Sequence, residues 1–174
     1  LARGPAKAAA LASLGAHAVL DPSSLPPGSA RLRDAVAGAV GGPRRVTIFL
    51  DNVGGPAFEE GLRCLGWGGA AAVIGFASGS IPSIPANLLL LQALRVVGIY
   101  WGPSRVHEPE LFASSLRRLV GLLAEGRLSI PVSHRVGLQD WREGWAALAE
   151  RRSFGKVLIC PGGGGGGGGG GSKL

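Results

Sequence analysis

Short apolar runs alternate along the chain with amphipathic stretches, and one of these runs is clearer than the others. Residues 46–50 form a β-branched apolar run of strand length, which ends at Asp51 and Asn52 and then turns through two glycines. Such a run is typical of a buried parallel strand. Ligands of open α/β sheets bind at the carboxyl edge of the strands, so Asp51, Asn52 and Gly54 are expected where a cofactor would lie. The alternative is that Asp51 and Asn52 only satisfy backbone donors in the turn.

The same alternation predicts the remaining elements. Helices are expected at residues 6–14, 30–40, 57–65, 86–93, 108–125 and 140–151. Strands are expected at residues 17–21, 69–76, 94–99, 132–136 and 156–159. Strands that alternate with helices predict an α/β fold with a doubly wound parallel sheet. The last strand–helix–strand segment is a candidate return to a second domain.

Composition narrows the class of protein. The 174 residues favour one domain, or one domain with a short piece of another. The longest apolar stretch, residues 84–100, is interrupted by proline, asparagine, glutamine and arginine, so no membrane span is expected. The net charge of +7 comes from scattered basic residues without an aromatic ladder, which argues against specific nucleic-acid binding. Cys64 and Cys160 lack nearby Cys or His partners, so no metal site is expected.

The carboxyl terminus differs from the rest of the chain. Residues 162–171 are all glycine, a composition that cannot form a core and is typical of a linker. The chain then ends in Ser172, Lys173 and Leu174, the tripeptide address that the peroxisomal import receptor reads. We therefore expect a peroxisomal protein; the alternative is a chance match and a cytoplasmic location.

Four motifs, in this order and spacing, resemble the carboxyl-terminal half of the zinc-free quinone oxidoreductases of the medium-chain dehydrogenase/reductase superfamily. They are Lys7 with Leu-Gly-Ala at residues 14–16, Asp-Asn-Val-Gly-Gly at 51–55, the stretch 62–69 leading into 74–79, and Arg-Ser-Phe-Gly-Lys-Val at 152–157. The resemblance covers nearly all of residues 1–159. Residues 99–102, Ile-Tyr-Trp-Gly, are similar to the quinone oxidoreductase-like branch.

The resemblance implies an enzyme that transfers hydride from NADPH to a quinone or conjugated carbonyl without a metal. Positions that match the family's cofactor site are Gly4, Lys7, Asn52, Phe76, Ser78 and Arg152. Arg3, Gly4 and Lys7 contain no acid, which favours NADPH over NADH because an acid would repel the 2′-phosphate. Pro22 departs from the tyrosine that some relatives use to contact the cofactor. No catalytic residue is expected in this half, because the cofactor supplies the chemistry.

The resemblance also implies a domain organisation. Residues 1–128 match part of a Rossmann-like dinucleotide-binding domain, 129–160 a return segment to the GroES-like catalytic domain, and 161–174 a linker with the targeting tail. The family's amino-terminal domain and its glycine-rich G-x-G-x-x-G turn have no match here. We therefore expect a fragment that is marginally stable and catalytically poor alone. Relatives commonly pair through the edge near residues 94–99, which implies a possible homodimer.

Two other hypotheses for the function of this chain stay open at this point. The chain is alternatively a non-catalytic nucleotide-binding or interaction module in the peroxisome, or a fragment without function. The motifs at residues 51–55 and 76–79 support a nucleotide site and therefore favour an enzyme or a binding module over the last reading.

Overall fold

The computed structural model describes residues 1–25 and 30–162. The predicted targeting residues Ser172, Lys173 and Leu174 lie outside the described residues. The chain divides into two compact units, Leu1–Phe112 and Ala113–Leu174. Within the described residues, no helix is both long enough and apolar enough to cross a membrane.

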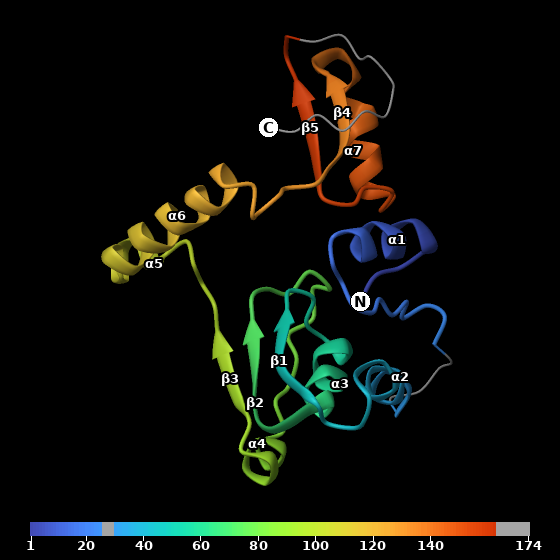
Figure 1. Cartoon of the computed structure of the whole chain (residues 1–174), viewed down its shortest axis with the longest axis vertical. Coiled ribbons are helices and arrows are strands. Elements are labelled where there is room, and N and C mark those ends of the chain that lie inside the picture. The colour runs from blue at the N-terminus through green and yellow to red at the C-terminus, as the bar shows by residue number, and fades with distance from the viewer. Residues whose placement is uncertain (26–29, 163–174) are drawn as a thin grey trace. The chain divides into compact units, whose positions relative to one another are not determined.

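A parallel sheet forms the centre of the first unit. Its three strands are β1 (Val46–Asp51), β2 (Leu65–Val73) and β3 (Arg95–Gly98), in the spatial order β1-β2-β3. Both strand pairs are parallel, as Figure 1 shows. The predicted α/β fold with parallel strands is therefore confirmed.

Helices connect these strands, as parallel pairing requires. The first unit contains α1 (Pro5–Ser13), α2 (Ala30–Val40), α3 (Pro56–Cys64), α4 (Ala86–Gln92) and the short α5 (Ser104–His107). Helix α3 packs on the sheet, and α2 packs against α3 (Figure 1). The following helix, α6 (Pro109–Ala124), runs across the boundary between the units.

The core of the first unit lies between α3 and one face of the sheet. Phe58 and Leu62 of α3 are buried with Leu65 and Ala71 of β2. The ring of Phe49, on β1, lies 5.7 Å from the ring of Phe58. On the opposite face of β1, Ile48 and Leu50 are 66% and 67% exposed. Side chains alternate between the two faces of a strand, so only one face of β1 is covered in this unit.

The second unit repeats the strand–helix–strand pattern on a small scale. Strands β4 (Val132–Gly137) and β5 (Lys156–Cys160) pair in parallel, and α7 (Trp141–Ala149) connects them after the 3-10 turn η1 (Leu138–Asp140). Gly144 allows α7 to approach this sheet, because a Cβ there would lie 3.0 Å from Val136 Cγ2 and 3.2 Å from Val157 Cγ1.

Two predicted strands differ from the observed elements. Residues 17–21 form no strand, because no neighbouring strand provides a ladder there; Leu20 O accepts a bond from Ala2 N–H at 3.0 Å. Strand β2 begins at Leu65, earlier than predicted, and ends at Val73 rather than at residue 76. Its early start includes Gly66, where a Cβ would collide with Arg44 O. Gly66, one of the glycines that obscured this strand in the sequence, therefore allows β2 to approach the turn before β1 closely.

We predict that Gly61→Ala lowers the stability of the first unit. Gly61 lies in α3 directly on the ring of Phe49, and an added Cβ would collide with that ring. Overpacking of this kind costs about 1–3 kcal/mol, more than the roughly 1 kcal/mol that alanine gains over glycine in a helix. Thermal unfolding monitored by circular dichroism measures the difference.

The matched control is Gly38→Ala in α2 of the same unit, because no atom lies within 4 Å of a Cβ at Gly38. This control should keep or raise the melting temperature, since it gains helix propensity without a clash. Equal effects of the two substitutions would contradict the packing assigned to Phe49.

Candidate functional site at the carboxyl edge of the sheet

The carboxylate of Asp51 organises the turn that follows β1. Its side chain is 6% exposed, and Oδ2 accepts a hydrogen bond from Gly54 N–H at 2.7 Å. Asp51 therefore satisfies a buried backbone donor. This is the turn role that the sequence analysis gave as the alternative to a cofactor contact. The side chain of the next residue, Asn52, is exposed at the same edge.

Backbone hydrogen bonds join this turn to the loop that follows β2. Asp51 O accepts from Ile74 N–H at 2.7 Å, Asn52 O from Ala77 N–H at 3.0 Å, and Val53 O from Ser78 N–H at 2.9 Å. The two loops therefore form one platform, defined by residues 51–55 and 74–80, at the carboxyl edge of two neighbouring strands.

The platform requires glycine at positions 54 and 55 because its two loops approach each other closely there. Gly54 has a φ of +74°, and a Cβ there would lie 2.7 Å from Ser80 O and 2.9 Å from Phe76 Cδ1. A Cβ at Gly55, with a φ of +62°, would lie 3.3 Å from Ser78 Oγ. Larger residues would separate the two loops, which explains why the turn carries two consecutive glycines.

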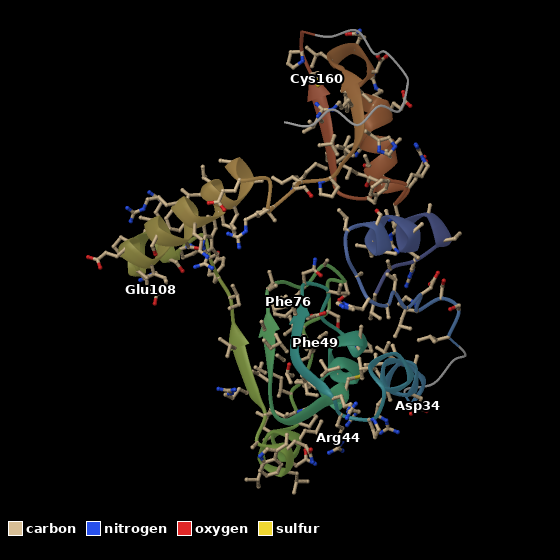
Figure 2. All side chains as sticks on the ribbon, in the orientation of Figure 1. Asp34, Arg44, Phe49, Phe76, Glu108 and Cys160 are labelled. Carbon is tan, nitrogen blue, oxygen red and sulfur yellow. The ribbon has the colours of Figure 1, made fainter. Side chains whose placement is uncertain are left out.

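Three predicted site residues meet on this platform. Asn52, Phe76 and Ser78 all have exposed side chains, and Phe76 is 42% exposed. Figure 2 shows Phe76 at the end of the sheet. The platform thus presents an amide, an aromatic ring and a hydroxyl where parallel α/β sheets bind ligands. Their individual roles stay predictions.

The turn before α1 is hydrogen-bonded to an acid, Asp21, that the sequence pattern does not predict there. Gly4 N–H donates to Asp21 Oδ2 at 2.7 Å. Asp21 Oδ1 accepts from Ser23 N–H at 2.8 Å and from the Ser23 hydroxyl. The Ser23 hydroxyl bond, followed by the backbone bonds from Gly4 and Ser23, lowers the pKa of Asp21, so this carboxyl is held in its ionised form.

The apolar pattern predicts a strand at residues 17–21, and therefore predicts no turn contact for Asp21. The signal in the sequence was Asp-Pro-Ser at residues 21–23, an acid followed by turn residues and able to bond the backbone two positions later. Lys7, two residues into α1, is half-buried near this turn in the chain. The structure thus pairs the amide of Gly4 with a carboxylate. The roles of Gly4 and Lys7 toward a cofactor stay predictions.

Arg152, the remaining predicted site residue, belongs to the second unit. It is exposed, and its Nε lies 2.7 Å from Glu150 Oε2. Its role toward a cofactor stays a prediction. Across the described part of the chain, no three His, Cys, Asp or Glu residues gather in a way that suits a metal ion.

The sequence of this chain is similar to a protein family and to several known proteins. The family model described as zinc-binding dehydrogenase matches residues 1–119. Quinone oxidoreductase-like protein 2 of Bos taurus is 38% identical over 128 residues, covering 74% of this chain and 36% of that protein. The homolog from Nematostella vectensis is 38% identical over 113 residues, covering 64% of this chain and 31% of that protein.

Solved structures share the fold. A mycobacterial protein in complex with NADPH has a TM-score of 0.72 and 25% identity, covering 91% of this chain and 48% of that one. Quinone oxidoreductase of Escherichia coli in complex with NADPH has a TM-score of 0.71 and 23% identity, covering 91% of this chain and 47% of that one.

The parallel sheet and its carboxyl-edge platform define a Rossmann-like α/β protein. The chain belongs to the zinc-binding dehydrogenase family, among the quinone oxidoreductase-like members of the medium-chain dehydrogenase/reductase superfamily. It spans about a third of the length of the curated relatives that it matches.

We predict that Gly54→Ala opens the platform. The added Cβ would press on Ser80 O and Phe76 Cδ1, so the bonds from Ala77 and Ser78 N–H should weaken. The expected cost is about 1–3 kcal/mol of overpacking in addition to the strain of a positive φ. Backbone amide exchange of Ala77 and Ser78 should become faster, and the melting temperature should fall.

Gly79→Ala provides the control for backbone strain. Gly79 has a φ of +76°, but no atom lies within 4 Å of a Cβ there. It carries the same conformational cost without the contact, so exchange at Ala77 and Ser78 should stay closer to that of the unsubstituted protein. The same exchange rates in both variants would show that the contact with Phe76 and Ser80 does not hold the loops together.

Proposed function

We propose that this chain is part of an NADPH-dependent oxidoreductase that transfers hydride to a quinone or conjugated carbonyl without a metal. The observation that carries the proposal is the carboxyl-edge platform, which exposes Asn52, Phe76 and Ser78 beside two paired loops. The similarity to a mycobacterial structure in complex with NADPH, together with the quinone oxidoreductase-like relatives, supports this choice.

The residues present fit a nicotinamide cofactor at the platform. When bound, NADPH supplies a hydride, while the protein supplies orientation and electrostatics. The side-chain amide of Asn52 and the hydroxyl of Ser78 both donate and accept hydrogen bonds. The ring of Phe76 adds an apolar surface for a planar group. Quinones and conjugated carbonyls delocalise the charge that follows hydride addition, so the reaction proceeds without a Lewis acid.

In this proposal, positively charged side chains bind the 2′-phosphate of NADPH. Gly4 N–H is bonded to Asp21, so that amide is engaged. Arg3 and Lys7 supply the positive charge, and the field of Arg3 already acts on Asp21. Within residues 1–25 and 30–162, Lys7 forms no ion pair. Lys7 is therefore the side chain we assign to the phosphate.

The same surface also suits a binding protein without catalysis. Exposed polar side chains beside paired loops are compatible with a nucleotide-binding or interaction module in the peroxisome, since no residue of this chain is assigned to proton transfer. A turnover assay distinguishes this second candidate from the enzyme, because both would bind nucleotide but only the enzyme would reduce a substrate.

A homodimer is a further part of the proposal. Strand β3 lies at the end of the order β1-β2-β3, so one of its edges has no partner strand in the described sheet. An edge of this kind is able to pair with a second copy of the chain.

We predict that Lys7→Gln in the full protein that carries this chain weakens NADPH binding about tenfold, because a charge-assisted contact to phosphate is lost. NADH binding should change by less than about twofold, because NADH lacks the 2′-phosphate. Nucleotide fluorescence titrations measure both affinities, and steady oxidation of NADPH in the presence of a quinone measures hydride transfer.

Lys156→Gln is the matched control, because Lys156 is an exposed lysine of the other unit and is assigned no cofactor role. Equal losses for NADPH and NADH in Lys7→Gln would refute the phosphate contact. Saturable NADPH binding without quinone or enone reduction would favour the non-catalytic module.

We also propose that the terminal tripeptide Ser172-Lys173-Leu174 directs the protein to peroxisomes through the import receptor. A fluorescent protein fused at the amino terminus of the full protein should show punctate peroxisomal fluorescence. Deletion of the three residues should make the signal diffuse, whereas deletion of three glycines from residues 162–171 should leave it punctate. Diffuse fluorescence of the intact fusion would instead support a cytoplasmic location.

A further inference from the structure

A pocket lined by arginines lies at the opposite end of the sheet from the platform. Its arginines come from three places: Arg33 from α2, Arg44 from the turn before β1, and Arg63 from α3. Leu62 and Leu65, each 1% exposed, contribute to its lining. Figure 2 shows Arg44 at the end of the sheet opposite to Phe76. The pocket is thus separate from the residues assigned to the nicotinamide cofactor.

The backbone of Arg44 is fixed by its surroundings. Arg44 has a φ of +54°, which is uncommon for a residue other than glycine. A Cβ at Gly66 of β2 would collide with Arg44 O, so the two backbones are in direct contact. A residue persists in this conformation when the packing around it requires it. The backbone conformation of Arg44 is therefore set by the packing against Gly66.

The positive charge of this pocket is incompletely balanced. Arg33 Nε lies 3.7 Å from Asp34 Oδ1, and both side chains are exposed. Arg44 and Arg63 form no ion pair with the acids in the described part of the chain. Guanidinium groups gathered in this way raise the local concentration of anions.

We propose that this pocket binds the phosphate group of a small phosphorylated ligand. A guanidinium presents paired N–H donors that match the oxygens of a phosphate. The side chain of Gln92, which also lines the pocket, adds an uncharged donor. The phosphate binds among the arginines, and the rest of the ligand extends into solvent.

The first test titrates the full protein that carries this chain with inorganic phosphate, pyrophosphate and a simple phosphate monoester, at an ionic strength kept constant with sodium chloride. Backbone amide NMR should show saturable shifts at Arg44, Arg63 and Gln92. The comparison of the three probes reports whether free phosphate, a diphosphate or an esterified phosphate fits best. Saturation in the millimolar range or tighter is the expected result.

Arg63→Gln should weaken phosphate binding about tenfold, since it removes one charge-assisted donor from an exposed side chain. Arg45→Gln is the matched control: it removes the same charge one residue from Arg44, but the Arg45 side chain lies against Gly41 and Gly42 and does not line the pocket. The control should retain binding within about twofold.

A second readout uses the full protein that carries this chain. Phosphate should raise its melting temperature over sodium chloride of equal ionic strength, and Arg63→Gln should abolish this increase while Arg45→Gln preserves it. Equal losses in both variants would overturn the proposal, because they would indicate a general charge effect. Absence of saturation, or shifts centred on Asn52 and Ser78, would overturn it as well. Failure of NADPH binding would leave this proposal unaffected, since the two sites share no residue.

Discussion

Burial of Phe58 and Leu62 against the sheet is the contact on which the first unit depends. Both side chains are 0–1% exposed, and they meet Leu65 and Ala71 of β2 in one cluster. Full burial of a side chain of this size contributes about 1.5–3 kcal/mol. Because α3 joins β1 to β2 in the chain, this packing also sets the two strands beside each other in parallel, and the loops at their carboxyl ends become neighbours.

The platform follows from that arrangement. Once β1 and β2 end side by side, Asp51 accepts the bond from Gly54 N–H, and the loop after β2 bonds to the backbone of residues 51–53. The polar groups of the turn are thereby satisfied within the protein. The side chains of Asn52, Phe76 and Ser78 remain exposed for a ligand. A rigid backbone that presents exposed side chains is what a site for an oriented cofactor requires.

The two ends of the sheet have different chemistry. The carboxyl edge combines a buried carboxylate with neutral donors and an aromatic ring, whereas the amino end gathers Arg33, Arg44 and Arg63. The glycines contribute to both ends through close backbone approach, Gly54 at the platform and Gly66 against Arg44. These two glycines therefore mark positions where neighbouring segments touch, whereas no atom lies within 4 Å of a Cβ at Gly38 or Gly79.

The sequence by itself determined the α/β class, the parallel strands and most element positions, because apolar periodicity and glycine turns are local signals. It also predicted that Asn52, Phe76 and Ser78 belong near one edge. Tertiary structure decided that residues 17–21 form no strand and that β2 begins at Leu65, since strand formation depends on a partner. It also decided that Asp21 bonds to Gly4 and that three arginines distant in sequence share one pocket. Those contacts join residues from different elements, and no local pattern encodes them.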